Sequence, residues 1–177
     1  MYWHIYIDSK YNLVISMPLK VMLNTNVLCR PYDDLRQKRI QVEATTALTL
    51  LKMIREEKLD LMYSETLDAE LCGIANEQKK DRVLNSIESY VKAFISFNTT
   101  VEQLGLYISE KCNISDLFDC YHLASAVLLY ADYFITCDDE LIQKAELLER
   151  VLKGRRYIIY IRNPVNFLQE VNLNDVE

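Results

Sequence analysis

Short apolar segments alternate along this chain with segments whose apolar residues recur every three or four positions. The short runs predict buried strands, and the helical spacing predicts amphipathic helices. The predicted strands are 21–23, 59–63, 94–97, 133–136 and 157–161. Strands that alternate with helices indicate a parallel sheet covered on both faces. The pattern therefore predicts an α/β fold, a three-layer α/β/α sandwich around a central, mostly parallel sheet.

Capping residues mark where several of the intervening helices begin. Ser64 and Ser115 are expected N-caps, and Thr99 or Thr100, each followed three residues later by Glu or Gln, fits a capping box. Asp138 or Asp139 is expected to cap a helix that continues to about residue 152 and ends at Gly154. The predicted helices are 39–57, 64–71, 81–91, 99–111, 115–128, 138–152 and a short one after Pro164.

The first sixteen residues are set apart from this alternation. Residues 2–7 and 11–15 are expected to form either an added hairpin or edge strand, or a loosely attached extension. Residues 17–177 are expected to form one domain, because a chain of 177 residues with half of them hydrophobic can build a single core. No apolar run approaches the roughly 18 residues that cross a membrane. The start of the chain also lacks the features of a signal peptide.

Cysteine content and net charge indicate the redox compartment of the protein and limit how it could bind nucleic acid. The five cysteines include no C-x-x-C pair and are expected to be reduced thiols in a cytoplasmic protein. The net charge of −6 argues against tight, non-specific binding of nucleic acid. A local basic surface stays possible, because Arg30, Arg36, Lys38 and Arg39 follow the first predicted strand. These side chains either form a solvated face or contact phosphates.

Polar residues follow two of the predicted strands. Asn24 ends the first run and Asp138 follows the run at 133–136. Ligands of open parallel sheets bind beyond the carboxyl ends of strands. Asp119, near the start of a helix, and Glu70, about one and a half turns into another, are expected to project into the same crevice. Acids crowded in this way repel one another unless a cation neutralises them.

The motifs around these residues resemble, in order and spacing, those of PIN domains. The stretches are Leu23-Asn24-Thr25-Asn26-Val27-Leu28, Ser64-x5-Glu70-Leu71, Asp119-x2-His122-Leu123-Ala124-x-Ala126 and Ile135-Thr136-x-Asp138. The resemblance covers roughly residues 20–170. PIN domains are typically Mg²⁺- or Mn²⁺-dependent ribonucleases, and many are homodimeric toxins of VapC-type toxin–antitoxin pairs. The resemblance therefore implies a metal-dependent endoribonuclease with RNA as substrate, a possible antitoxin partner and a homodimer.

Carried over by position, the family's acids fall on Asn24, Glu70, Asp119 and Asp138. The resemblance implies that the three acids are catalytic and bind Mg²⁺ or Mn²⁺, with Asn24 as the fourth metal ligand. Asn24 departs from the family pattern because an amide has an oxygen but no negative charge and cannot act as a base. We therefore expect reduced metal affinity and activity, or alternatively a non-catalytic module that binds RNA or a protein. Asn24 is either natural or a substitution that silences a toxic nuclease.

The remaining motif positions are expected to position the substrate. The resemblance places Thr136 on a small hydroxyl position and Asn26 on a polar position. Arg30 begins the Arg30-Pro31-Tyr32-Asp33-Asp34 stretch, which resembles a toxin-like subgroup of bacteria and archaea.

Several of the same residues also have simpler interpretations. Asp119 and Asp138 fit plain helix caps, since both precede or begin helices. His122 is interpreted as a packing histidine because no second His stands near it in the sequence. Cys29 and Cys137 are interpreted as small buried residues because no base accompanies either thiol.

Overall fold

A five-stranded sheet forms the centre of the computed structural model, which describes residues 4–7 and 13–174. The strand order is β5-β4-β3-β6-β7, and every neighbouring pair is parallel. The strands are β3 (Leu19–Leu23), β4 (Leu59–Ser64), β5 (Val91–Ile95), β6 (Tyr133–Ile135) and β7 (Tyr160–Arg162). The predicted α/β fold is confirmed, and the central sheet is entirely parallel.

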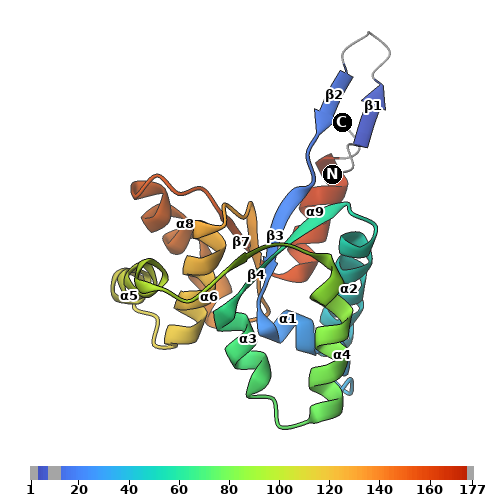
Figure 1. The fold of residues 1–177 in the computed structure, drawn as a ribbon, viewed down its shortest axis with the longest axis horizontal. Helices are drawn as coiled ribbons and strands as arrows, with labels where there is room; N and C mark the ends of the chain where they lie inside the picture. Colours follow the sequence, from blue (N-terminus) through green and yellow to red (C-terminus); the bar gives the residue numbers. More distant parts are fainter. Residues whose placement is uncertain (1–3, 8–12, 175–177) are drawn as a thin grey trace.

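Helices cover both faces of this sheet, as Figure 1 shows. The pleat sends alternate side chains to opposite faces, so that Val21 and Leu23 enter one core and Met22 enters the other. The first core is shared with α1 (Thr25–Cys29), α2 (Lys38–Arg55), α3 (Glu65–Cys72), α4 (Glu77–Ile87) and α9 (Pro164–Asn174). The second is shared with α5 (Thr99–Cys112), α6 (Leu117–Leu128), α7 (Asp139–Gln143) and α8 (Ala145–Gly154). Two short 3₁₀ helices complete the fold: η1 (Arg30–Tyr32) lies between α1 and α2, and η2 (Glu88–Tyr90) lies between α4 and β5.

Some predicted boundaries are corrected by the structure. The strand expected at 94–97 lies at Val91–Ile95, and the strand expected at 157–161 lies at Tyr160–Arg162. Both are edge strands of the sheet. An edge strand is partly exposed, so its apolar pattern is weak and its limits depend on the neighbour with which it pairs. The helix expected at 81–91 begins earlier, at Glu77, because Asn76 caps it.

Three predictions of helix ends are also wrong, and in two of them a neighbouring side chain provides the cap. Asn98, rather than Thr99 or Thr100, accepts hydrogen bonds from the amides of residues 100 and 101 and begins α5. Asp116, rather than Ser115, caps α6. The expected helix 138–152 is two helices, with a break at Lys144, and Gly154 is the last residue of α8 rather than a stop after it.

The amino-terminal segment forms a hairpin in its described part. Strands β1 (His4–Ile7) and β2 (Leu13–Ser16) pair antiparallel in a separate two-stranded sheet. Figure 1 shows this hairpin extending beyond the amino-terminal end of β3, away from the central layers. In the described ranges 4–7 and 13–16, the segment therefore forms the hairpin that was one of the expected alternatives. It does not add an edge strand to the central sheet.

Among the helices of the described residues, none is both long and apolar enough to cross a lipid bilayer.

Candidate functional site

The predicted site residues meet at the carboxyl ends of β3 and β6. Asn24 directly follows β3, and its backbone N–H donates to Ile135 O of β6 at 2.9 Å. Strands β4 and β5 follow β3 on one side in the sheet, and β6 and β7 follow it on the other side. The order of the strands thus reverses between β3 and β6. Such a switch point is where open α/β sheets bind ligands.

Asn24 is buried at this edge and makes three side-chain hydrogen bonds. Its Oδ1 accepts from the Thr25 backbone N–H at 2.7 Å, and its Nδ2 donates to Asp119 Oδ1 at 2.9 Å and to Thr136 Oγ1 at 3.2 Å. These partners define which end of the amide faces the site, because exchanging O and N would bring two acceptors together at Asp119. A hydrogen-bond donor, rather than an oxygen, therefore faces Asp119.

The carboxylate that Asn24 contacts, Asp119, is also within the electrostatic influence of Asp138. Burial raises the pKa of Asp119 to about 6; the hydrogen bond from Asn24 opposes that shift, and the negative charge of Asp138 adds to it. Asp138 Oδ1 accepts from Leu141 N at 2.8 Å and caps α7, which confirms its interpretation as a helix cap. Asp119 does not cap α6, because Asp116 occupies that position. The Asp119 carboxylate is thus free of a structural role in starting its helix.

Thr136 and Asn26 hold the loop that carries Asp138. Asn26 Oδ1 accepts from the Cys137 backbone N–H at 2.8 Å, and its Nδ2 donates to Thr136 Oγ1 at 3.2 Å. The Thr136 hydroxyl also accepts from Asp138 N at 3.0 Å. Of the two residues to which the resemblance gives positioning roles, Thr136 therefore belongs to the loop between β6 and α7, and Asn26 contacts that loop.

Glu70 lies across the same edge and contacts a residue that the sequence did not single out as its partner. Its Oε2 lies 2.8 Å from His122 Nε2 and also accepts a hydrogen bond from Thr25 Oγ1. Burial alone would raise the pKa of Glu70, but the hydrogen bonds from His122 and Thr25 outweigh it and lower that pKa. His122 is buried, as interpreted from the sequence, and in addition anchors Glu70. In the sequence, the feature that could have indicated a role for His122 in the site is its position one helical turn after Asp119.

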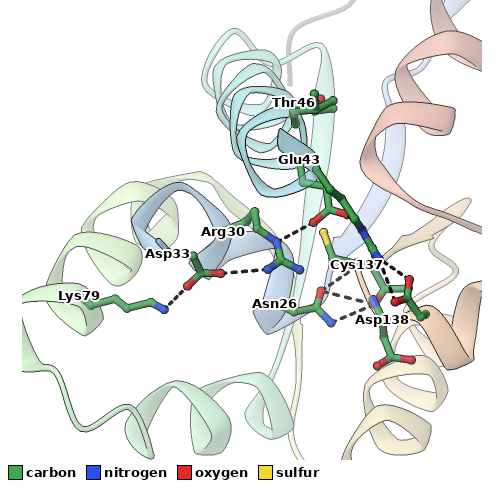
Figure 2. Close-up of polar contacts among 12 residues, drawn as sticks. Asn26, Arg30, Asp33, Glu43, Thr46, Lys79, Cys137 and Asp138 are labelled. Atoms are coloured by element: carbon green, nitrogen blue, oxygen red, sulfur yellow. Dashed lines mark hydrogen bonds and ion pairs between the residues drawn. The ribbon is translucent and has the colours of Figure 1, made fainter. Parts of the chain in front are cut away.

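Arg30 lies in an ion-pair cluster beside the site, shown in Figure 2. Its Nη1 is 3.1 Å from Asp33 Oδ2, and its Nε is 2.9 Å from Glu43 Oε2, a carboxylate that is buried in the fold. Lys79 Nζ approaches the other oxygen of Asp33 at 2.7 Å. The guanidinium predicted to position substrate is therefore engaged by two carboxylates.

A pocket of about 380 Å³ opens between this cluster and the loop 136–139. Its lining includes Asn26, Arg30, Arg39, Glu43, Cys137 and Asp138. Arg39 donates to Glu43 Oε1 at 2.7 Å and to Asp139 Oδ2 at 2.9 Å. Two members of the predicted basic stretch, Arg30 and Arg39, thus reach the pocket, whereas Arg36 pairs with Asp34 at the exposed surface. The positive charges at the pocket are balanced by neighbouring carboxylates.

The Mg²⁺ or Mn²⁺ implied by the resemblance requires several oxygen ligands in one place. Within residues 4–7 and 13–174, no group of three or more His, Cys, Asp or Glu is arranged so that it could hold a metal ion. Glu70 is engaged by His122 and Thr25, and Asn24 turns its N–H toward Asp119. As arranged, these residues do not fit a divalent cation.

The two cysteines near the site, Cys29 and Cys137, are buried. Burial raises the pKa of the Cys137 thiol to about 11, and it also raises the pKa of Cys29. A thiol with a raised pKa is a poor nucleophile at neutral pH. The interpretation of Cys29 and Cys137 as small buried residues is confirmed.

Comparison with known proteins identifies the fold. No protein-family model matches the chain, and no curated protein does. Among solved structures, FitAcB from Neisseria gonorrhoeae is 18% identical with a TM-score of 0.50, and the match covers 81% of this chain and 97% of that one. VapBC2 from Rickettsia felis, bound to a DNA fragment from their promoter, is 13% identical with a TM-score of 0.48, covering 82% and 98%. At 18% identity, the likeness to FitAcB shows that the chain shares its α/β fold.

Proposed function

We propose that this protein is an endoribonuclease of the PIN type whose activity, dependent on Mg²⁺ or Mn²⁺, is strongly reduced by Asn24. The observation that carries the proposal is the contact between Asn24 Nδ2 and Asp119 Oδ1. It brings together two motif positions 95 residues apart in the sequence, at the strand ends where ligands bind. It also presents a neutral donor at the place where the resemblance calls for an acid.

Each motif residue has a proposed role in that reaction. Asp119, Asp138 and Glu70 supply the negative charge of the site, and Asn24 supplies the uncharged fourth position. In Asn24→Asp, which restores the fourth carboxylate, these four side chains would hold a divalent cation, and that cation would supply water activation and charge neutralisation at the phosphate.

The other proposed roles concern how the substrate and the loop are held. Thr136 and Asn26 hold the loop of Asp138, a role that their hydrogen bonds to that loop support. Arg30 acts indirectly, because its guanidinium pairs with Asp33 and Glu43.

Cleavage of a mixed-sequence labelled RNA in the presence of Mn²⁺ tests the proposal. Asn24→Asp restores the carboxylate and is expected to cleave faster than the unmodified protein by a factor on the order of 10². Asp119→Asn is expected to abolish cleavage. The matched control is Asn98→Asp, which makes the same chemical change at the cap of α5 and should cleave like the unmodified protein. Equal rates in all four proteins would refute the proposal.

A second candidate is a non-catalytic PIN-type module that binds RNA or a protein partner. The observation that favours it concerns the arrangement of potential ligands. Among the described residues, no three or more His, Cys, Asp or Glu side chains are grouped so that they could hold a metal ion. This candidate predicts that neither the unmodified protein nor Asn24→Asp cleaves RNA. It also predicts that RNA binding, measured by fluorescence anisotropy, is equal in the unmodified protein and in Asp119→Asn.

The proposal includes two protein partners, an antitoxin and a second copy of the chain. Apolar side chains exposed on β5 and at the start of α6, namely Phe94, Leu117 and Phe118, offer contact area for such a partner. Light scattering during size-exclusion chromatography tests the homodimer directly. The expected mass is twice that of one chain, and a single-chain mass at micromolar concentration would refute this part.

A further inference from the structure

The Asn24 amide is more tightly held than its role as a helix cap requires. Only Oδ1 is needed to accept from Thr25 N and begin α1, yet both protons of Nδ2 are also used. One proton reaches Asp119 and the other reaches Thr136. The side chain is 1% exposed, so water cannot replace these partners without opening the site.

The partners of Asn24 are themselves fixed. Thr136 Oγ1 also accepts from Asn26 Nδ2 and from Asp138 N, and Asn24 N donates to Ile135 O. Rotating the amide would therefore leave several buried polar groups unpaired, each at a cost in stability. The donor facing Asp119 is a built feature of the folded chain.

An amide N–H carries a partial positive charge and can satisfy a carboxylate that would otherwise face other acceptors. It does so without the dehydration that a small divalent cation must undergo. We infer that the Asn24 amide takes the place of a bound cation, so that this site is complete without a divalent metal. The inference rests on the proposal that this sheet edge is the nuclease site, and it gives a physical reason for the reduced activity proposed there.

The same geometry defines what an acid at position 24 would do. Aspartate has acceptors only, so the hydrogen bond to Asp119 would be lost and two carboxylates would face each other, whereas the Thr136 hydroxyl could turn to donate to the new acid. Like charges at this distance repel strongly in a buried site. A divalent cation would relieve that repulsion, so a metal requirement is expected to appear with Asn24→Asp.

Thermal unfolding of the full chain, purified with a chelator and measured with and without Mn²⁺, tests the inference. The unmodified protein is expected to melt at the same temperature in both conditions. Without metal, Asn24→Asp is expected to melt about 5–10 °C lower, and Mn²⁺ is expected to restore most of that loss. Asn98→Asp, which keeps its capping acceptor, is expected to match the unmodified protein in both conditions.

Two further measurements keep the test decisive if Asn24→Asp does not fold without metal. Asn24→Ser removes the amide without adding charge, so it is expected to lower the melting temperature with no response to Mn²⁺. Calorimetric titration of the unmodified protein is expected to show no binding at micromolar Mn²⁺, whereas the residual cleavage proposed above is expected only at millimolar Mn²⁺. Micromolar Mn²⁺ binding by the unmodified protein that Asp119→Asn abolishes would overturn the inference, as would equal stabilisation by Mn²⁺ of Asn24→Asp and the unmodified protein.

These measurements contain no RNA. Failure of the ribonuclease proposal would appear in the cleavage assay, whereas failure of this inference would appear in the melting and binding data. The two failures are therefore distinguishable.

Discussion

His122 Nε2 lies 2.8 Å from Glu70 Oε2, and this contact joins α6 to α3 inside the candidate site. The imidazole is 1% exposed, whereas the Glu70 side chain is 42% exposed. A buried donor thus anchors a carboxylate that reaches the surface of the site. Because Glu70 also accepts from Thr25, the glutamate links α6, α3 and α1.

Replacing His122 is expected to destabilise the fold. His122→Ala would leave a cavity between α3 and α6 and remove the donor to Glu70, at a cost on the order of 2–5 kcal/mol in the free energy of unfolding. Glu70→Ala should cost less, because the glutamate is partly solvated. Urea unfolding followed by circular dichroism measures both changes. A larger loss for Glu70→Ala than for His122→Ala would contradict this account.

The buried ion pair of Arg30 and Glu43 is expected to be costly to break and cheap to replace. Glu43→Ala would leave a largely buried guanidinium with one partner fewer, at about 3–5 kcal/mol. The double variant Arg30→Met/Glu43→Leu should lose much less, because no unpaired charge is left behind. Chemical denaturation measures the difference. As a control, Arg36→Ala removes an exposed pair and should change stability by less than about 1 kcal/mol.

Gly105 of α5 is expected to tolerate no side chain. A methyl group there would collide with the ring of Tyr121 on α6, at a cost of about 1–3 kcal/mol from overpacking. Gly154→Ala is the matched control, since nothing lies within 4 Å of a methyl group there and the substitution should be neutral or slightly stabilising. Differential scanning calorimetry should show a lower melting temperature for Gly105→Ala alone, and equal melting of the two variants would rule out the predicted clash.

The Thr136 hydroxyl is expected to matter more than its methyl group. Thr136→Val keeps the shape but removes the acceptor used by Asn24, Asn26 and the Asp138 amide, so a loss of about 1–3 kcal/mol or more is expected. Thr136→Ser keeps the hydroxyl and should lose about 1 kcal/mol for one buried methyl group. Guanidinium unfolding compares the two variants. Equal losses would mean that packing, rather than hydrogen bonding, holds this loop.

The sequence by itself determined the fold class and the candidate residues. The alternation of short apolar runs with helical spacing is a local property, and it predicted the α/β sheet with helices on both faces. The polar residues after strands were also visible locally, because parallel strands deliver their carboxyl ends to one edge. Asn24 and Asp138 follow from this pattern, whereas Glu70 and Asp119 follow from their places early in helices and from the resemblance to PIN motifs.

Only the tertiary structure decided what these side chains do to one another. The neighbouring positions of β3 and β6 bring Asn24 to Thr136 across 112 residues of sequence. The direction of the Asn24 amide, the His122 contact with Glu70 and the pairing of Arg30 with Glu43 all depend on that arrangement. Hydrogen bonds act over about 3 Å and depend on direction, so strand register and side-chain rotamers decide them. Those are properties of the folded chain, whereas hydrophobic periodicity can be read along the unfolded one.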